Sequence, residues 1–362
     1  MIGKSTFCEA RKKLKSSALP AINQILIEKV NENQLLKQWK GYRLYAVDGS
    51  RIRLPNEPVI IERFGCLGNN NADHDCAMGL ASACYDVMND LVVEARLAAS
   101  YSSERDMALN HLKAVTAPNP LFLYDRGYAA FWFIKAHEEK QVDFCMRTPW
   151  NLFNETRDFY LSGKRQQIVW LKAGETAKAL CQKYQVSDRP VKVRLVRVDL
   201  PSDIEILITS VTDRKRIHHS EFKGLYHKRW GVEEIFKRLK SRLEIENFTG
   251  KSPLAVQQDF HAKVVACNLS ALLAQAAQPQ VDQATSGCKH RYAVNQSQAL
   301  SRLKSGWLVL FKCSADRLTV LINDLVVTIS LCREIIRPNR QYPRHVANKK
   351  KARYPMAYKR QL

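Results

Sequence analysis

Residues 44–50, LYAVDGS, form an apolar, β-prone run that ends at an acid followed by a Gly-Ser turn. Residues 121–128, LFLYDRGY, repeat this pattern, with Asp125 in the place that Asp48 has in the first run. Short apolar runs that end in turn residues are typical of buried strands, and open α/β sheets bind ligands beyond the carboxyl ends of their strands. Asp48 and Asp125 are therefore candidate site residues, although an Asp after a strand also serves as a turn former or a helix N-cap.

A third acid lies in a segment with helical periodicity at residues 226–240, YHKRWGVEEIFKRLK. At about 100° per residue, four of its polar side chains share an arc of about 60°: Tyr226, Arg229, Glu233 and Lys240. This arc borders an apolar stripe, so the Glu233 carboxylate is expected where a buried face meets solvent. Glu234 points about 100° away and is not the expected ligand. Charged neighbours three or four residues apart are also common on solvated helices, so this segment alone does not identify a site.

The candidate catalytic and metal-binding residues are three acids without histidine or cysteine: Asp48, Asp125 and Glu233. Carboxylate oxygens are the ligands that Mg²⁺ and Mn²⁺ prefer, and two such ions close together are typical of phosphoryl transfer. Arg229 and Lys240 are expected to hold phosphates beside the scissile bond, and Tyr226 to add a hydroxyl donor. Because unpaired acids repel one another, we expect the empty site to be loose and metal to order it.

These motifs resemble those of the DDE transposases of the insertion sequence 4 family, which carry a YREK signature around the last acid. The spacing from Tyr226 to Lys240 fits that signature at all four positions. Four further segments are similar to family segments: VDGS at 47–50, DRGY at 125–128, FCMR at 144–147 and IENFTG at 245–250. The likeness runs from about residue 4 to the C-terminus.

The resemblance implies an α/β fold with a ribonuclease H-like mixed-sheet catalytic core, interrupted by a β-rich insertion and flanked by helical segments. It implies a transposase that uses Mg²⁺ or Mn²⁺, with two ions, to cut DNA at element ends and transfer strands in cut-and-paste transposition. The implied partners are double-stranded DNA with terminal inverted repeats, target DNA, and a second copy of the chain in a synaptic homodimer. Arg147, which ends the family's matching strand, and Lys237 join the candidate DNA-binding residues.

The resemblance also implies that the insertion holds a flipped base of a DNA hairpin intermediate on an aromatic side chain. Trp150 and Trp170 are the candidates for this stacking. A tryptophan in a β-rich segment is more often part of a core, so the structural alternative stays open for both.

Composition favours a nucleic-acid partner. Lys and Arg number 57 against 35 Asp and Glu, which gives a net charge of +22 and a pI of about 9.6, and a strongly basic protein is expected to bind a polyanion. The sequence shows no apolar run long enough for a membrane span and no signal-peptide pattern, which predicts a cytoplasmic, nucleoid-associated bacterial protein. The ten cysteines contain no C-x2-C pair, so neither a zinc ribbon nor a disulfide framework is expected.

Six segments are expected along the chain: a basic helical segment at 1–41, a first core part at 42–147, the β-rich insertion at 148–212, a second core part with the YREK helix at 213–275, a helical region at 276–332 and a basic tail at 333–362. The first segment is expected to form two short DNA-contacting helices broken at Pro20. Strands are expected at 42–48, 79–85, 91–98, 121–125, 167–171, 191–198 and 205–211, and helices at 103–115, 129–139 and 253–275. The polar stretch 277–295 is expected to be a linker or loop.

Two other functions remain compatible with the residues. Family members carry a longer helical region before the first acid than residues 1–47 provide, so a catalytically inactive or truncated DNA-binding protein derived from a transposase is one alternative. A general nuclease of the ribonuclease H type would use the same metals without needing inverted-repeat ends.

Overall fold

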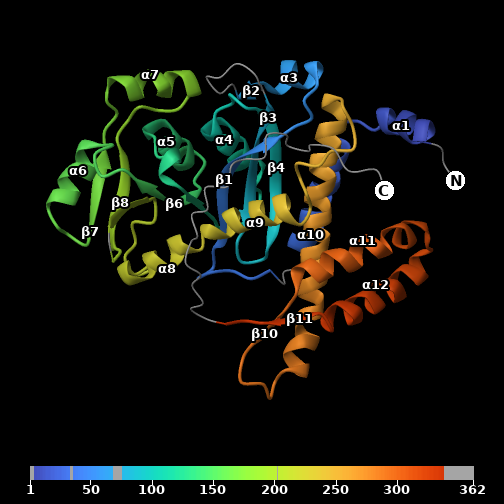
Figure 1. The fold of residues 1–362 in the computed structure, drawn as a ribbon. Helices are drawn as coiled ribbons and strands as arrows, with labels where there is room; N and C mark the ends of the chain where they lie inside the picture. The colour runs from blue at the N-terminus through green and yellow to red at the C-terminus, as the bar shows by residue number, and fades with distance from the viewer. Residues whose placement is uncertain (1–3, 33–35, 68–75, 202, 338–362) are drawn as a thin grey trace.

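Nine strands form one mixed sheet at the centre of the molecule (Figure 1). The structure is a computed structural model that describes residues 4–32, 36–67, 76–201 and 203–337. The strands are β1 (Arg43–Arg53), β2 (Cys66–Leu67), β3 (Cys76–Asp86), β4 (Leu91–Ala99), β5 (Pro120–Tyr124), β6 (Asp143–Thr148), β7 (Gln166–Leu171), β8 (Val191–Asp199) and β9 (Ile204–Thr209).

The first part of the sheet has ribonuclease H-like topology. β1, β3 and β4 form an antiparallel meander, with β3 between the other two. β5 then pairs parallel to β1 on its other side, and β6 pairs parallel to β5. The order β4-β3-β1-β5-β6 confirms the mixed α/β sheet that the resemblance implies, and the strands lie close to their expected ranges.

The expected β-rich insertion joins the same sheet. β9 pairs antiparallel with β6, and β8 and β7 follow outward from β9. Two helices of this segment, α6 (Asn154–Leu161) and α7 (Glu175–Tyr184), lie beside these strands at one end of the molecule (Figure 1). Its strands therefore extend the core sheet, a non-local pairing that strand periodicity does not reveal.

Helices cover both faces of the sheet, and the alternation of side chains along each strand decides which residue faces which layer. Leu44 and Ala46 of β1, with Leu121 and Leu123 of β5, pack in the core beneath α8 (Phe222–His227), α9 (Trp230–Ser241) and α10 (Pro253–Ala284). The intervening residues of both strands pack on the opposite side with α4 (Glu104–Ala114) and α5 (Phe131–Glu139). Figure 1 shows α9 lying across the strands of the sheet.

The expected single helix around Glu233 is two helices in the structure. α8 ends at His227 and α9 begins at Trp230. Between them the amides of Lys228 and Arg229 bond to carbonyls three residues earlier, at 3.1 and 3.0 Å, which tightens the turn. A projection on one continuous helix is therefore wrong across residues 228–229.

The expectation of a linker at 277–295 is wrong for its first part, because α10 continues to Ala284 and includes Pro279. Ala277 and Val281 are fully buried, in one cluster with Val326 and Ile329. This cluster lies between α10 and a hairpin of α11 (Gln296–Lys312) and α12 (Ala315–Ser330), and short strands β10 (Tyr292–Val294) and β11 (Arg333–Ile335) close the hairpin. Tertiary packing thus sustains a helix whose exposed face is polar.

The N-terminal helices α1 (Lys4–Lys13) and α2 (Ala18–Glu32) pack on the core. The break comes before Pro20, which lies in the first turn of α2, where proline is tolerated. Arg11 of the basic α1 pairs with Asp259 of α10 at 2.9 Å. Asn23 of α2 donates to the carbonyls of Val92 and Val93 on β4, at 3.2 and 3.1 Å, and so covers this edge strand.

Most of the expected basic tail, residues 338–362, lies outside the described residues. None of the helices in the described part of the chain is long and apolar enough to cross a membrane.

Candidate active site

Register brings Asp48 and Asp125 to neighbouring positions. In the parallel pairing of β1 with β5, Val47 lies opposite Tyr124, and the two acids are the next residues of their chains. Asp48 has the same alternation parity as Leu44 and Ala46, which face the α8–α9 layer. Both acids thus lie where the helices that carry the third acid cover the sheet.

The α8–α9 segment completes the site. The hydroxyl of Tyr226, from α8, donates to Asp125 Oδ1 at 3.3 Å. Arg229 Nη2 donates to Glu233 Oε1 at 2.8 Å, across one helical turn. Buried apolar residues hold α9 against the sheet: Val232, Ile235, Phe236 and Leu239. The tight turn between the helices therefore still directs Tyr226, Arg229 and Glu233 to one region.

Asp48 and Glu233 border a common cavity of about 200 Å³. Its other lining residues are Gly49, Ser50, Phe236, Lys237 and Lys240. Two carboxylates and two lysine ammonium groups therefore meet at one small opening, as the helical arc predicted for Glu233 and Lys240. Asp125 does not line this cavity and is tied to the site through Tyr226.

Burial leaves Asp48 poorly stabilised as an anion. Loss of solvent raises the pKa of Asp48 to about 6, and the nearby carboxylates of Glu104 and Glu233 act in the same direction. The Gly49 amide, which donates to Asp48 Oδ1 at 2.9 Å, and the Arg229 guanidinium partly offset this effect. A carboxylate that is this incompletely satisfied is a candidate for binding a cation.

Arg229 lies among the acids. Its side chain is only 7% exposed, and its Nε has no hydrogen-bond partner. Burial acts to lower the pKa of the guanidinium, yet the pKa is raised, because Tyr226 and the carboxylates of Glu233 and Asp125 lie close. In this arrangement the guanidinium compensates carboxylate charge, whereas the sequence predicted a phosphate contact for it.

The donor set fits a hard divalent cation in chemistry, since it offers carboxylate and hydroxyl oxygens and no sulfur or imidazole. Across the described residues, however, no group of three or more His, Cys, Asp or Glu is close enough to hold a metal ion. The three acids share a region without being drawn together.

The other predicted DNA-binding residues lie in two places. Lys240 Nζ donates to the Arg51 carbonyl at 2.8 Å, and Lys237, 63% exposed, pairs with Glu234; both belong to the cavity rim. Arg147 is on β6 and pairs with Glu205 at 3.1 Å.

The two candidate tryptophans are exposed. Trp150 follows β6, is 45% exposed and stacks on Tyr160, with ring centroids 5.3 Å apart. Trp170 lies on β7 and is 56% exposed. Neither is a core residue, so the structural alternative for these two positions is wrong, and both rings have a surface that a base can reach.

Sequence reasoning missed two residues near Asp48. Glu104, at the start of α4, lies so close to Gly49 that a Cβ there would meet its Cδ at 2.9 Å. Tyr128, in the turn after Asp125, is buried and its hydroxyl has no partner. DRGY at residues 125–128 was a signal for Tyr128, but nothing in the sequence marks Glu104, because its proximity arises from helix-to-strand packing.

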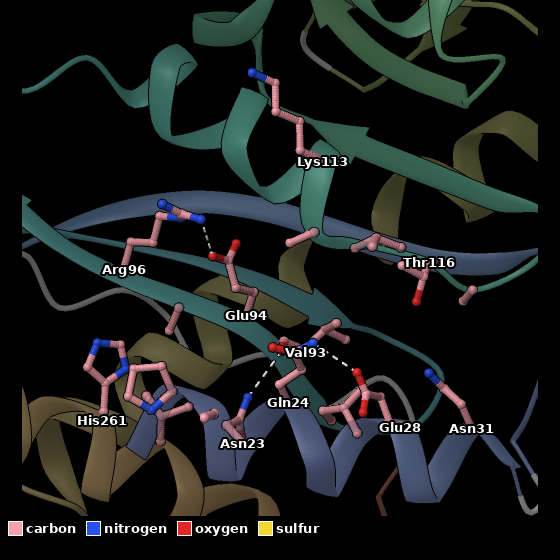
Figure 2. Close-up of a pocket in the computed structure, with 18 of the residues that line it drawn as sticks. Asn23, Gln24, Glu28, Asn31, Val93, Glu94, Arg96, Lys113, Thr116 and His261 are labelled. Atoms are coloured by element: carbon pink, nitrogen blue, oxygen red, sulfur yellow. Dashed lines mark hydrogen bonds and ion pairs between the residues drawn. The ribbon is translucent and has the colours of Figure 1, made fainter. Parts of the chain in front are cut away.

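A larger cavity of about 550 Å³ lies away from the acids, between α2, β4 and α4 (Figure 2). Figure 2 shows Asn23, Gln24 and Glu28 of α2 below the strand that carries Glu94 and Arg96. Glu94 and Arg96 pair at 2.6 Å. None of the three predicted acids lines this space, so it does not belong to the candidate active site.

Comparisons with known proteins identify relatives of this chain. Residues 39–269 match the family model described as the transposase DDE domain. The chain is 24% identical, over 371 residues, to the transposase InsG for insertion sequence element IS4 of Escherichia coli K12, an alignment that covers 99% of this chain and 79% of the relative. A piggyBac transposase in a synaptic complex with hairpin DNA is similar with a TM-score of 0.43 and 10% identity, over 78% of this chain and 57% of that chain.

Proposed function

The chain belongs to the DDE transposase family, in its insertion sequence 4 group, and on this premise we propose that Asp48, Asp125 and Glu233 are its catalytic residues. Membership makes the protein a transposase, with nuclease and strand-transfer chemistry. The observation that carries the residue assignment is the convergence of neighbouring positions on β1 and at the end of β5 with the α9 helix. Each of the three acids comes from a different element, and each has Arg229 or Tyr226 beside it.

DDE transposases use divalent metal ions, and we infer that the ions here are Mg²⁺ or Mn²⁺, two for each site, held by the three acids. The oxygen-only donor set supports this assignment. When bound, the ions activate the attacking hydroxyl and stabilise the leaving oxygen of the phosphodiester. Tyr226 fixes the orientation of Asp125 by its hydrogen bond. The positive charge of Arg229 offsets the electrostatic repulsion between the carboxylates of Glu233 and Asp125.

Basic residues at the cavity rim are proposed to hold the DNA. Lys240 and Lys237 would contact phosphates next to the scissile bond as point charges. Arg229 would donate to a phosphate from its Nε, which has no partner in the protein, while its Nη2 bonds to Glu233. Arg147 is proposed to contact the DNA backbone farther from the scissile bond. Trp150, with Trp170 as the second candidate, would stack on a flipped base because its exposed ring is already held by Tyr160.

The proposed reaction is cut-and-paste transposition: hydrolysis at the element ends, followed by attack of the freed 3′-hydroxyl on target DNA. The proposed partners are duplex DNA with terminal inverted repeats, target DNA and a second copy of this chain in a homodimeric synaptic complex. The net charge of +22 supports DNA binding. We place this activity in the bacterial cytoplasm, at the nucleoid.

The test is cleavage of a labelled duplex that carries the inverted repeat flanking the gene, with Mg²⁺ and the full chain. Glu233→Gln removes one acid at constant shape, and Glu234→Gln is the matched control, because Glu234 is exposed on the next position of the same helix. A duplex with a scrambled end controls for sequence specificity.

We expect site-specific nicking by the wild type and by Glu234→Gln, and loss of nicking with retained DNA binding in Glu233→Gln. Substantial cutting by Glu233→Gln would exclude this residue as a catalytic acid. Tight binding without nicking by any variant would favour the inactive DNA-binding alternative, and equal cutting of the scrambled end would favour a general nuclease.

A further inference from the structure

The Glu104 side chain lies against the backbone at Gly49, next to Asp48. Glu104 is the first residue of α4, after the N-cap Ser103. The position next to Asp48 is a glycine, and a Cβ at Gly49 would lie 2.9 Å from Glu104 Cδ and 3.0 Å from its Oε1. The close approach of the Glu104 carboxyl to the backbone after Asp48 therefore requires a residue without a side chain.

Among the described residues, no positively charged side chain explains why the Glu104 carboxyl lies close to Asp48. Within the described part of the chain, Glu104 makes no ion pair and no side-chain hydrogen bond, whereas the other acid of the same turn, Asp106, accepts the hydroxyl of Tyr184 at 2.6 Å. A glutamate in the first turn of a helix is favoured by the helix dipole. That preference explains the residue type but not its position against Asp48, where like charges repel.

A second, independent feature points to a ligand at the same place. Tyr128 is only 2% exposed, yet its hydroxyl has no hydrogen-bond partner. Burial raises the pKa of the phenol, and the carboxylates of Glu104, Asp48 and Asp125 raise it further. The hydroxyl thus lies within electrostatic range of all three acids. A buried hydroxyl that lacks a partner in the protein usually has one in a water or an ion.

The backbone around these groups is fixed. Arg105, the neighbour of Glu104, donates from Nε to the Gly127 carbonyl at 2.8 Å. This bond joins the start of α4 to the turn that carries Tyr128. The start of α4 is therefore held next to the turn that carries Tyr128, so the backbone that positions Glu104 and Tyr128 is supported by packing.

We propose that Glu104 is a fourth carboxylate of the active site, which binds, directly or through one water, the divalent cation that Asp48 holds, and that the Tyr128 hydroxyl bonds to a water or carboxylate oxygen of that ion. The proposal rests on the proposed function, since it presumes a cation at Asp48. It adds a ligand that approaches from the face of β1 covered by α4, next to Gly49, while α9 lies on the other face. Gly49 keeps this side open.

The test measures Mn²⁺ binding to the full chain without DNA, by electron paramagnetic resonance titration, so that its readout is independent of cleavage. Glu104→Gln removes the charge at constant shape, and Glu104→Asp keeps the charge but withdraws it by one methylene. Glu175→Gln is the matched control, because Glu175 is also the first residue of a helix, α7, on a distant part of the sheet. Asp48→Asn reports on the proposed function itself.

We expect both Glu104 variants to weaken one Mn²⁺ site by about tenfold or more, as for groups that contact or position a bound metal, and Glu175→Gln to bind like the wild type. Wild-type binding by Glu104→Gln would overturn the proposal. Wild-type binding by Glu104→Asp alone would also overturn it, because the role would then be a general charge effect. If Asp48→Asn leaves Mn²⁺ binding unchanged, the proposed function fails first.

Hydroxyl radicals generated by Fe²⁺ in place of Mn²⁺ give a second readout. Radical cleavage of the chain is expected near residues 48–50 and 103–105 in the wild type, and near 48–50 alone in Glu104→Gln. Cleavage that never includes the start of α4 would contradict a cation at Glu104.

Discussion

Two carboxylates beside β1 have opposite surroundings: Asp86 is buried, and Asp48 is half-buried. At the start of the strand, Asp86 of the paired strand accepts bonds from Arg43 Nε at 3.1 Å and from Arg43 Nη2 at 2.5 Å. Asn89 adds its side-chain amide at 2.9 Å and its backbone amide at 3.2 Å. In the middle of the strand, just past the last residue of β1 that pairs with β5, Asp48 accepts one hydrogen bond, from the Gly49 amide.

Burial raises the pKa of both acids, so the difference between them lies in their partners. Both carboxylate oxygens of Asp86 accept hydrogen bonds, from the Arg43 guanidinium and from the amides of Asn89, which is the arrangement of a structural ion pair. Asp48 is left incomplete beside other acids, an arrangement that is costly unless a ligand completes it. The start of β1 is thus held by a structural ion pair, and its middle carries an acid that we propose to be catalytic.

The largest expected effect is a loss of activity, which distinguishes Asp48 from the Arg43–Asp86 pair. Asp48→Asn should reduce Mg²⁺-dependent cleavage of an inverted-repeat end by about a thousandfold or more, because the proposed function makes Asp48 a metal ligand in a reaction that depends on the metal. The rate of nicking measures the loss, and thermal unfolding checks that the fold is retained.

Asp199→Asn is the control for this change, because Asp199 is also an aspartate of a sheet strand, β8, and is exposed, with an ion pair to Arg197. Its activity should equal that of the wild type. If both variants lose activity alike, Asp48 has no special role, and the contrast between Asp48 and Asp86 is wrong.

The second prediction concerns the ion pair between Arg43 and Asp86. Arg43→Met leaves Asp86 buried without its cation, which should lower the free energy of unfolding by about 3 to 5 kcal/mol. Urea denaturation measures the change. Arg51→Met, an exposed change toward the other end of β1, should cost no more than about 0.5 kcal/mol. Equal losses in the two variants would show that the Arg43–Asp86 pair does not stabilise the fold.

The third prediction uses the raised pKa of Asp48. Between about pH 4 and pH 6 the folded chain keeps a proton on Asp48 that the unfolded chain has released, so this group makes stability fall as pH rises through that window and contributes a constant penalty above it. Asp48→Asn removes the effect. Without metal, the mutant should gain about 1 to 3 kcal/mol over the wild type between pH 4 and pH 7.

Urea titrations of both proteins at several pH values give this difference, and the difference cancels the titration of the remaining acids. A constant gap between the two proteins across the range would contradict the raised pKa of Asp48.

The smallest expected effect is at the exposed rim of the cavity that Asp48 and Glu233 border. Lys237→Ala should change stability by less than about 0.5 kcal/mol but reduce the salt dependence of DNA binding by about one phosphate contact. Lys178→Ala is the control, since Lys178 also pairs with a glutamate three residues earlier, on distant α7. Equal salt slopes in both variants would remove Lys237 from the DNA surface.

Local patterns predicted much of the fold. Alternating apolar residues that end at Asp48 and Asp125 gave the two central strands, and the spacing from Tyr226 to Lys240 gave the helical segment of Glu233. These signals are local, because a strand or an amphipathic helix shows its period within a few residues. The break at residues 228–229 left no such signal, and neither did the extension of α10 beyond residue 276, which depends on contacts with α12.

The sequence by itself determined the net charge of +22, the three candidate acids and most of the elements that carry them. Only the tertiary structure decided that Val47 and Tyr124 pair in register, that strands β7 to β9 continue the core sheet, and that Glu104 and Tyr128 lie beside Asp48. The physical reason is that residue type and period are properties of a short stretch of chain. Proximity between α4, β1 and the turn after β5 arises from packing between segments far apart in sequence.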